Sequence, residues 1–112
     1  MNNKELALKA AEVLDDKKAQ DIMIIDISKI SGFADYFVIA SGGSERQVKA
    51  LSEEVEDKLN EAGAATRSIE GKNGSGWVLM DFGDVIVNIF TIEMRERYNI
   101  EKIWSDGEII TV

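Results

Sequence analysis

The sequence predicts a single α/β (α+β) domain in which helices pack on a mixed β-sheet of about five strands. The first observation behind this prediction is the length, because 112 residues suffice for one modest core. The second is that apolar residues recur at helical spacing in some segments and form short β-branched runs in others. No repeat, low-complexity tract or long linker divides the chain, so we treat residues 1–112 as one domain.

The first part of the chain is expected to form a helix and then a strand. Asn2 or Asn3 can cap the helix, because an amide oxygen accepts hydrogen bonds from the free N–H groups of the first turn. The apolar face of this helix is formed at helical spacing by Leu6, Ala10, Val13 and Leu14. The segment DIMIIDIS, residues 21–28, is short, apolar and β-branched, which predicts a strand. A loop around Gly32 follows it.

The middle of the chain has the pattern of a strand, a long helix and a second strand. Residues 36–40 are continuously apolar, as expected for a strand that is covered on both faces. Ser44 and Gln47 have the spacing of a capping box at the start of the helix. The buried stripe of this helix is predicted to consist of Val48, Leu51, Val55 and Leu59. A strand over residues 65–70 then completes a βαβ unit with a right-handed crossover.

Two further strands are predicted to form a hairpin after a glycine-rich loop over residues 71–76. Residues 77–81 and 85–90 are apolar runs with little between them. The FGD triplet is therefore the turn, because Gly83 can adopt the positive φ that a tight turn demands. A short helix is expected over residues 92–98. A further apolar turn before the tail contains Ile100, Ile103 and Trp104.

The first strand of the hairpin has two different faces, and the sequence leaves open which one is covered. Alternation places Trp77, Leu79 and Asp81 on one face, and Val78 and Met80 on the other. One of these faces must pack against the helices. The large aromatic side chains at the start and the turn of the hairpin either complete the local core or act as anchors for another protein.

The residue types of the chain exclude several kinds of catalytic site. There is no Cys and no His, so a disulfide framework, a structural zinc site and a Ser–His or Cys–His pair are excluded. The DFG triplet, which holds magnesium in protein kinases, occurs here without the other kinase motifs. The SGGS turn, residues 41–44, can bind phosphate at a helix N-terminus, but the chain lacks a Walker lysine and a converging pair of acids. We expect no enzyme, no metal and no cofactor, with nucleotide binding or transfer at SGGS as the alternative.

The charge of the chain favours a protein partner over nucleic acid. Acidic residues outnumber basic ones 21 to 13, and the net charge is -8. Domains that bind duplexes usually present a basic face, so direct binding to DNA is not expected. An acidic surface suits a basic protein partner, although solubility alone would also account for it. Residues 1–14 mix charged and apolar side chains, which is typical of neither a signal peptide nor a membrane span. We therefore expect a cytoplasmic protein without membrane contact.

Three linked segments resemble the ribosomal silencing factor family, RsfS, also called the Iojap family. They are DYFVIASGGSERQVKALSEEVEDKL, WVLMDFGDVIVNIF and RERYNIEKIW, in the family's order and spacing. The resemblance implies a sheet related to the nucleotidyltransferase fold but without its catalytic acids. It also implies binding to the large ribosomal subunit through large-subunit ribosomal protein fourteen, a basic protein. Members bound there block joining of the small subunit and repress translation under nutrient limitation. Some members act in large-subunit assembly, which is the alternative function.

The resemblance also implies a contact surface on the hairpin. Its candidate residues are Trp77, Leu79, Met80, Asp81, Phe82 and Asp84. The two aromatic residues would be apolar anchors, and the two aspartates would meet Lys or Arg of the partner. Phe82 replaces a frequent Tyr of the family, which removes a phenolic hydroxyl. Asn88 replaces a common His, which leaves the role of that position open. The outer edge of the hairpin can also pair with a second copy, so a homodimer of the free protein remains open.

Overall fold

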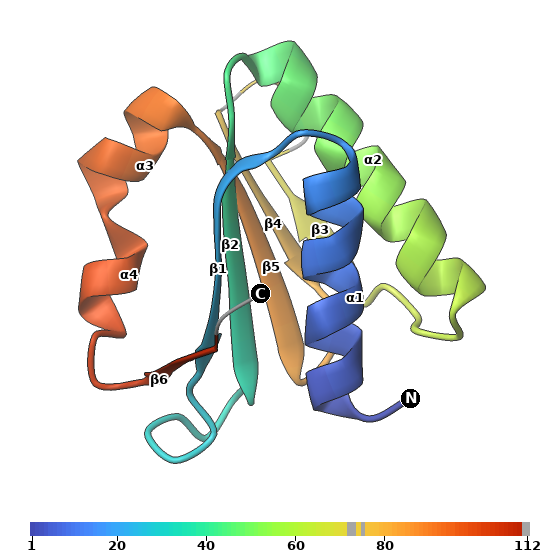
Figure 1. The fold of residues 1–112 in the computed structure, drawn as a ribbon, viewed down its shortest axis with the longest axis vertical. Coiled ribbons are helices and arrows are strands. Elements are labelled where there is room, and N and C mark those ends of the chain that lie inside the picture. The colour runs from blue at the N-terminus through green and yellow to red at the C-terminus, as the bar shows by residue number, and fades with distance from the viewer. Residues whose placement is uncertain (72–73, 75, 111–112) are drawn as a thin grey trace.

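The computed structural model describes residues 1–71, 74 and 76–110, and three positions of the expected glycine-rich loop, 72, 73 and 75, lie outside this description. Within it, the chain forms an open sheet with helices on both faces (Figure 1). The strands are β1 (Gln20–Asp26), β2 (Tyr36–Gly42), β3 (Ser68–Glu70), β4 (Trp77–Asp81), β5 (Val85–Thr91) and β6 (Glu108–Ile110). The helices are α1 (Asn3–Asp16), α2 (Glu45–Glu61), α3 (Ile92–Tyr98) and α4 (Ile100–Ile103).

The strand order across the sheet is β3-β4-β5-β2-β1-β6. The central pair, β2 and β5, is parallel, and the other neighbouring pairs are antiparallel, which confirms the mixed sheet. The expectation of about five strands was one too low, because the described residues include β6 in the C-terminal tail. The strands before and after α2 run in the same direction, as a βαβ unit requires. They are not neighbours, however, because the β4–β5 hairpin lies between them.

Side-chain caps determine where the two long helices begin. The Asn2 side chain accepts from the Glu5 N–H at 2.8 Å, and the Glu5 carboxylate accepts from the Asn2 N–H at 3.3 Å, which completes a capping box. The capping box predicted for α2 is only half formed. The Ser44 hydroxyl accepts from the Gln47 N–H at 3.1 Å, but the Gln47 side-chain oxygen accepts from the Gly43 N–H, not from that of Ser44, at 2.6 Å.

The sheet separates two hydrophobic cores. Helices α1 and α2 lie side by side on one face, and α3 and α4 lie on the other (Figure 1). Every residue predicted for the apolar stripes of the two long helices is buried in the α1/α2 core. The core on the α3/α4 face contains Ile25, Ile27, Ala34, Phe37, Ile39, Ile86 and Phe90. None of the helices in the described part of the chain is long and apolar enough to span a membrane.

Candidate functional site

The β4–β5 hairpin carries the predicted contact residues, and its register shows which of them share a face. Trp77 lies opposite Phe90, Leu79 opposite Asn88, and Asp81 opposite Ile86. These side chains point to the α3/α4 side of the sheet, where Trp77 and Leu79 pack on the second core. Helix α3 packs on β5 and β2, whereas the main helix contact of β4 is with α2, on the opposite face. Trp77, Leu79 and Asp81 therefore remain partly exposed, and we call this surface the open face.

The Trp77 indole is held in place from three directions. Its ring stacks on Phe90 with a centroid distance of 5.0 Å and an interplanar angle of 24°, and it contacts the Tyr98 ring at 5.0 Å. The indole N–H donates to the Asn88 side-chain oxygen at 3.1 Å. A partly exposed aromatic ring that is already fixed loses little conformational freedom on binding, which suits an interface anchor.

Asn88 supplies the acceptor that orients this indole. Its side chain is fully buried in β5, and its amide nitrogen has no hydrogen-bond partner within the described residues. A buried unpaired donor costs about 1–3 kcal/mol, so the position is not optimised for stability alone. In this structure the Asn88 oxygen therefore orients the Trp77 indole through their hydrogen bond. The sequence contained one sign of it, an amide within the apolar run VIVNIF.

The two aspartates of the predicted surface occupy different surroundings. One oxygen of Asp81 accepts from the Gly83 N–H at 2.7 Å and so stabilises the turn, where Gly83 has a φ of 97°. The Asp84 carboxylate is exposed but points toward α1, where it accepts from the Asn3 amide at 3.3 Å. The same amide donates to Asp35 at 3.0 Å. Asp81 thus belongs to the open face, whereas Asp84 points toward the α1 side of the sheet.

Two of the predicted contact residues need correction. Met80 is 0% exposed and Phe82 is 8% exposed, and both pack in the α1/α2 core. Met80 follows the alternation of β4 onto the closed face, and the Phe82 ring turns into the same core just after the strand ends. Neither side chain offers contact area in this fold, so Phe82 is not an exposed anchor. The structure brings together only Trp77, Leu79 and Asp81.

The margin of the open face on the β3 side is mainly acidic. Glu70 pairs with Leu79 across β3 and β4, so it extends the same face, and it is exposed. Asp81 lies two pairs further along the same two strands, opposite Ser68. The Arg67 side chain lies beside Gly83 at the turn and offsets part of this charge. An apolar centre with a mainly acidic edge is complementary to a protein surface that presents Lys or Arg beside apolar groups.

Comparison with known proteins defines the family of this chain. The family model described as "Ribosomal silencing factor during starvation" matches residues 1–112. The chain belongs to the ribosomal silencing factor family. The RsfS protein of Bacillus subtilis is 42% identical over 97% of this chain and 92% of its own length. A crystal structure of a Chromobacterium violaceum protein superposes with a TM-score of 0.91 at 39% identity, covering 99% of this chain and 92% of that one.

A more distant relative comes from an organelle. The mouse protein named "Mitochondrial assembly of ribosomal large subunit protein 1" is 31% identical over 83% of this chain, which spans 42% of that protein. The resemblance read from the three sequence segments is thus confirmed at the level of the family and the fold.

The SGGS turn, residues 41–44, lies beside a hollow of about 640 Å³. The hollow lies at the carboxyl ends of the parallel strands β2 and β5, where α/β sheets commonly bind ligands. Three of its lining residues are Glu45, Glu93 and Glu96, and their charge disfavours a phosphate group. The Gly43 N–H is already bonded to Gln47. Among the described residues, no group of three or more acidic side chains is arranged to hold a metal ion.

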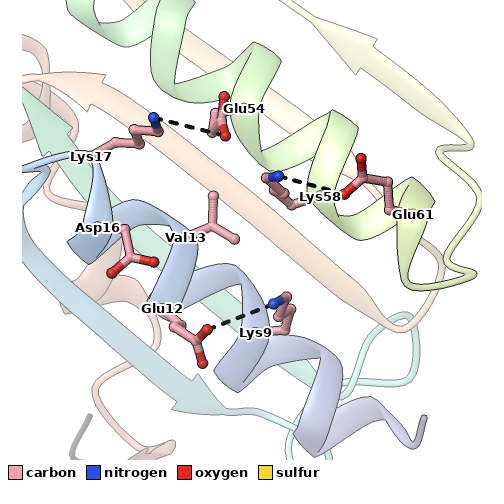
Figure 2. Close-up of a pocket in the computed structure, with 8 residues that line it drawn as sticks. All are labelled: Lys9, Glu12, Val13, Asp16, Lys17, Glu54, Lys58 and Glu61. Carbon is pink, nitrogen blue, oxygen red and sulfur yellow. Dashed lines mark ion pairs between the residues drawn. The ribbon is translucent and has the colours of Figure 1, made fainter.

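A second hollow, of about 430 Å³, lies between α1 and α2 (Figure 2). Its lining residues are Lys9, Glu12, Val13, Asp16, Lys17, Glu54, Lys58 and Glu61. Three ion pairs of 3.6–4.0 Å occur among them, and one, Lys17–Glu54, joins the two helices. Such exposed pairs contribute little to stability, and the mixed charges do not converge on one kind of ligand.

Two residues of the site were missed by sequence reasoning. Asn88 was noted only as a departure from the family pattern, and Tyr98 was assigned to a short helix without a role. The contact of Tyr98 with Trp77 depends on how α3 folds back over the sheet. No local sequence signal reports such a contact.

Proposed function

We propose that this protein binds the large ribosomal subunit through large-subunit ribosomal protein fourteen and represses translation when nutrients are limiting. The observation that carries the proposal is the open face, where the preorganised Trp77 ring lies beside Leu79 and an acidic margin. A basic protein surface is its natural complement. Membership of the ribosomal silencing factor family supports the same partner.

The mechanism that we propose is steric and needs no catalysis. The bound domain occupies volume that the small subunit must fill, so the two subunits do not join. The net charge of -8 draws the protein toward a basic protein and repels it from the surrounding RNA. The rate of association with isolated ribosomal protein fourteen should therefore fall as salt concentration rises. A rate that does not depend on salt would remove the electrostatic part of this proposal.

The proposal is tested by co-sedimentation with purified large subunits, followed by addition of small subunits. The wild-type protein should bind the large subunits and reduce the yield of whole ribosomes. Leu79→Arg places a positive charge in the centre of the open face and should abolish both effects. Leu8→Arg is the matched control, because Leu8 is an exposed apolar residue of α1, on the other side of the sheet. Normal binding by a folded Leu79→Arg variant would refute the interface.

An assembly role is the second candidate, and the name of the mouse relative favours it. The same open face would then bind the large subunit while that subunit is still maturing. The co-sedimentation experiment separates the two functions. Binding that leaves subunit joining intact would support assembly, and binding with loss of whole ribosomes would support silencing.

A further inference from the structure

The loop between β1 and β2 presents two large apolar side chains to solvent. Ile30 is 45% exposed and Phe33 is 60% exposed. Exposed apolar residues are common one at a time, but this short loop presents two of them within four positions. Phe33 leaves more than half of its surface in water, so core packing alone does not explain a ring at this position.

Hydrogen bonds within the loop order its backbone. The backbone N–H groups of Ile30 and Ser31 both donate to the Ile27 carbonyl, at 3.0 and 2.8 Å. The Phe33 N–H donates to the Ser31 hydroxyl at 3.2 Å. Ile27 and Ala34 are buried and fix the two ends of the loop in the second core. A loop that is already ordered loses little entropy when a partner binds it.

The Phe33 ring lies on the same side of the sheet as the open face. The Phe33 ring contacts Phe37 at a centroid distance of 6.1 Å and Trp104 at 5.8 Å. Phe37 pairs with Ile86 across β2 and β5, and Ile86 pairs with Asp81 across β5 and β4. Paired side chains project to one face, so this row leads from the loop to the open face.

We propose that Ile30 and Phe33 form an apolar knob that extends the docking surface of the open face and contacts the same basic ribosomal protein. This inference rests on the proposed function. The acidic margin lies on the β3 side of the open face, and the knob lies on the opposite side, beyond β2. The partner surface must then carry Lys or Arg at one end and apolar residues at the other, which selects a single docking orientation.

The direct test compares the affinity of loop variants for isolated ribosomal protein fourteen and for large subunits. The double variant Ile30→Ser and Phe33→Ser should bind both about tenfold to a hundredfold more weakly, as expected when exposed anchors are lost. Phe33→Lys is a second variant whose aliphatic stem can still cover Phe37 and Trp104, while its charge opposes the basic partner. Phe33→Leu should keep most of the affinity. Leu8→Gln is the control on the far face, and thermal unfolding verifies that each variant is folded.

The outcomes separate this inference from the proposed function. Wild-type affinity of the loop variants, with loss of binding by Leu79→Arg, would overturn the knob and leave the proposed function standing. Normal binding by Leu79→Arg would overturn both. If the loop variants lose binding to large subunits but still bind isolated ribosomal protein fourteen, the loop contacts another ribosomal component. That result would overturn the inference that the knob and the open face share one partner. If the loop variants change only the self-association of the protein, the knob contacts a second copy of the chain. That result would also overturn the inference.

Discussion

One face of the sheet lies under two long helices, whereas the other lies under two short ones. Helices α1 and α2 have 14 and 17 residues, and α3 and α4 have 7 and 4. Under the long helices, the hairpin residues Val78 and Met80 are buried. On the face of the short helices, their neighbours Trp77 and Leu79 stay partly exposed, and the donor of the buried Asn88 amide has no partner among the described residues.

Within β4, burial therefore alternates from one residue to the next. Alternate residues of β4 belong either to the closed core or to the open face that we propose as the docking surface, because successive side chains project to opposite faces. The α1/α2 face supplies most of the apolar burial that stabilises the domain. That stability allows the α3/α4 face to leave part of a sheet uncovered. The following changes, from the largest expected effect to the smallest, test this comparison.

The largest expected effect comes from truncating adjacent residues of β4. Met80→Ala should lower the free energy of unfolding by about 2–5 kcal/mol, because it leaves a cavity in the closed core. Leu79→Ala should cost less than about 1 kcal/mol, since its side chain is partly exposed, but it should weaken binding to large subunits. Urea unfolding and co-sedimentation measure the two effects. Equal losses of stability would show that the faces do not differ.

The second change separates orientation of the indole from stability. Asn88→Leu removes the acceptor for Trp77 and also a buried donor that has no partner in the part of the chain that the structure describes, so stability should change by less than about 1 kcal/mol. Binding to large subunits should weaken about fivefold, because the indole loses its hydrogen bond. Asn88→His supplies a ring nitrogen as acceptor and should restore most of the affinity.

A double-mutant cycle completes this test. In a Trp77→Phe background there is no indole N–H left to orient, so Asn88→Leu should weaken binding no further. A full additional loss in that background would show that Asn88 acts through something other than the Trp77 ring.

The smallest expected effect concerns the start of the β1–β2 loop. The Asp26 carboxylate accepts from the Ser28 hydroxyl at 2.6 Å and from the Ser28 N–H at 2.9 Å, and these bonds lower the pKa of Asp26 below its ordinary value of 3.8. The stabilisation is therefore complete above pH 3.8 and disappears as the pH falls through the lower, folded pKa. Hydrogen exchange of the Ser28 amide should accelerate, relative to its intrinsic rate, only in this acidic range. Ser28→Ala should abolish the pH dependence.

The hairpin and the helices were predictable because local rules determine them. Gly83 indicated the turn, and the apolar stripes indicated the buried faces of α1 and α2. Strand β6 was missed, since its three residues form a strand only by pairing with β1. Alternation identified the two faces of β4 but could not rank their exposure, because that depends on the lengths of helices elsewhere in the chain. The residues alone left open whether Phe82 joins the core or anchors a partner; the exposed anchor implied by the resemblance is not found, because its ring packs in the α1/α2 core.

The position of β5 between β4 and β2 has a consequence for synthesis of the chain on the ribosome. Helix α1, strands β1 and β2, and helix α2 all emerge before β5 does. Until β5 emerges, the backbone N–H and C=O groups on one edge of β2 have no strand to pair with. The parallel pairing at the centre of the sheet closes only after the hairpin has left the exit tunnel. Until then the nascent domain exposes an unpaired strand edge and apolar side chains. Aggregation and binding by chaperones compete with folding at this stage.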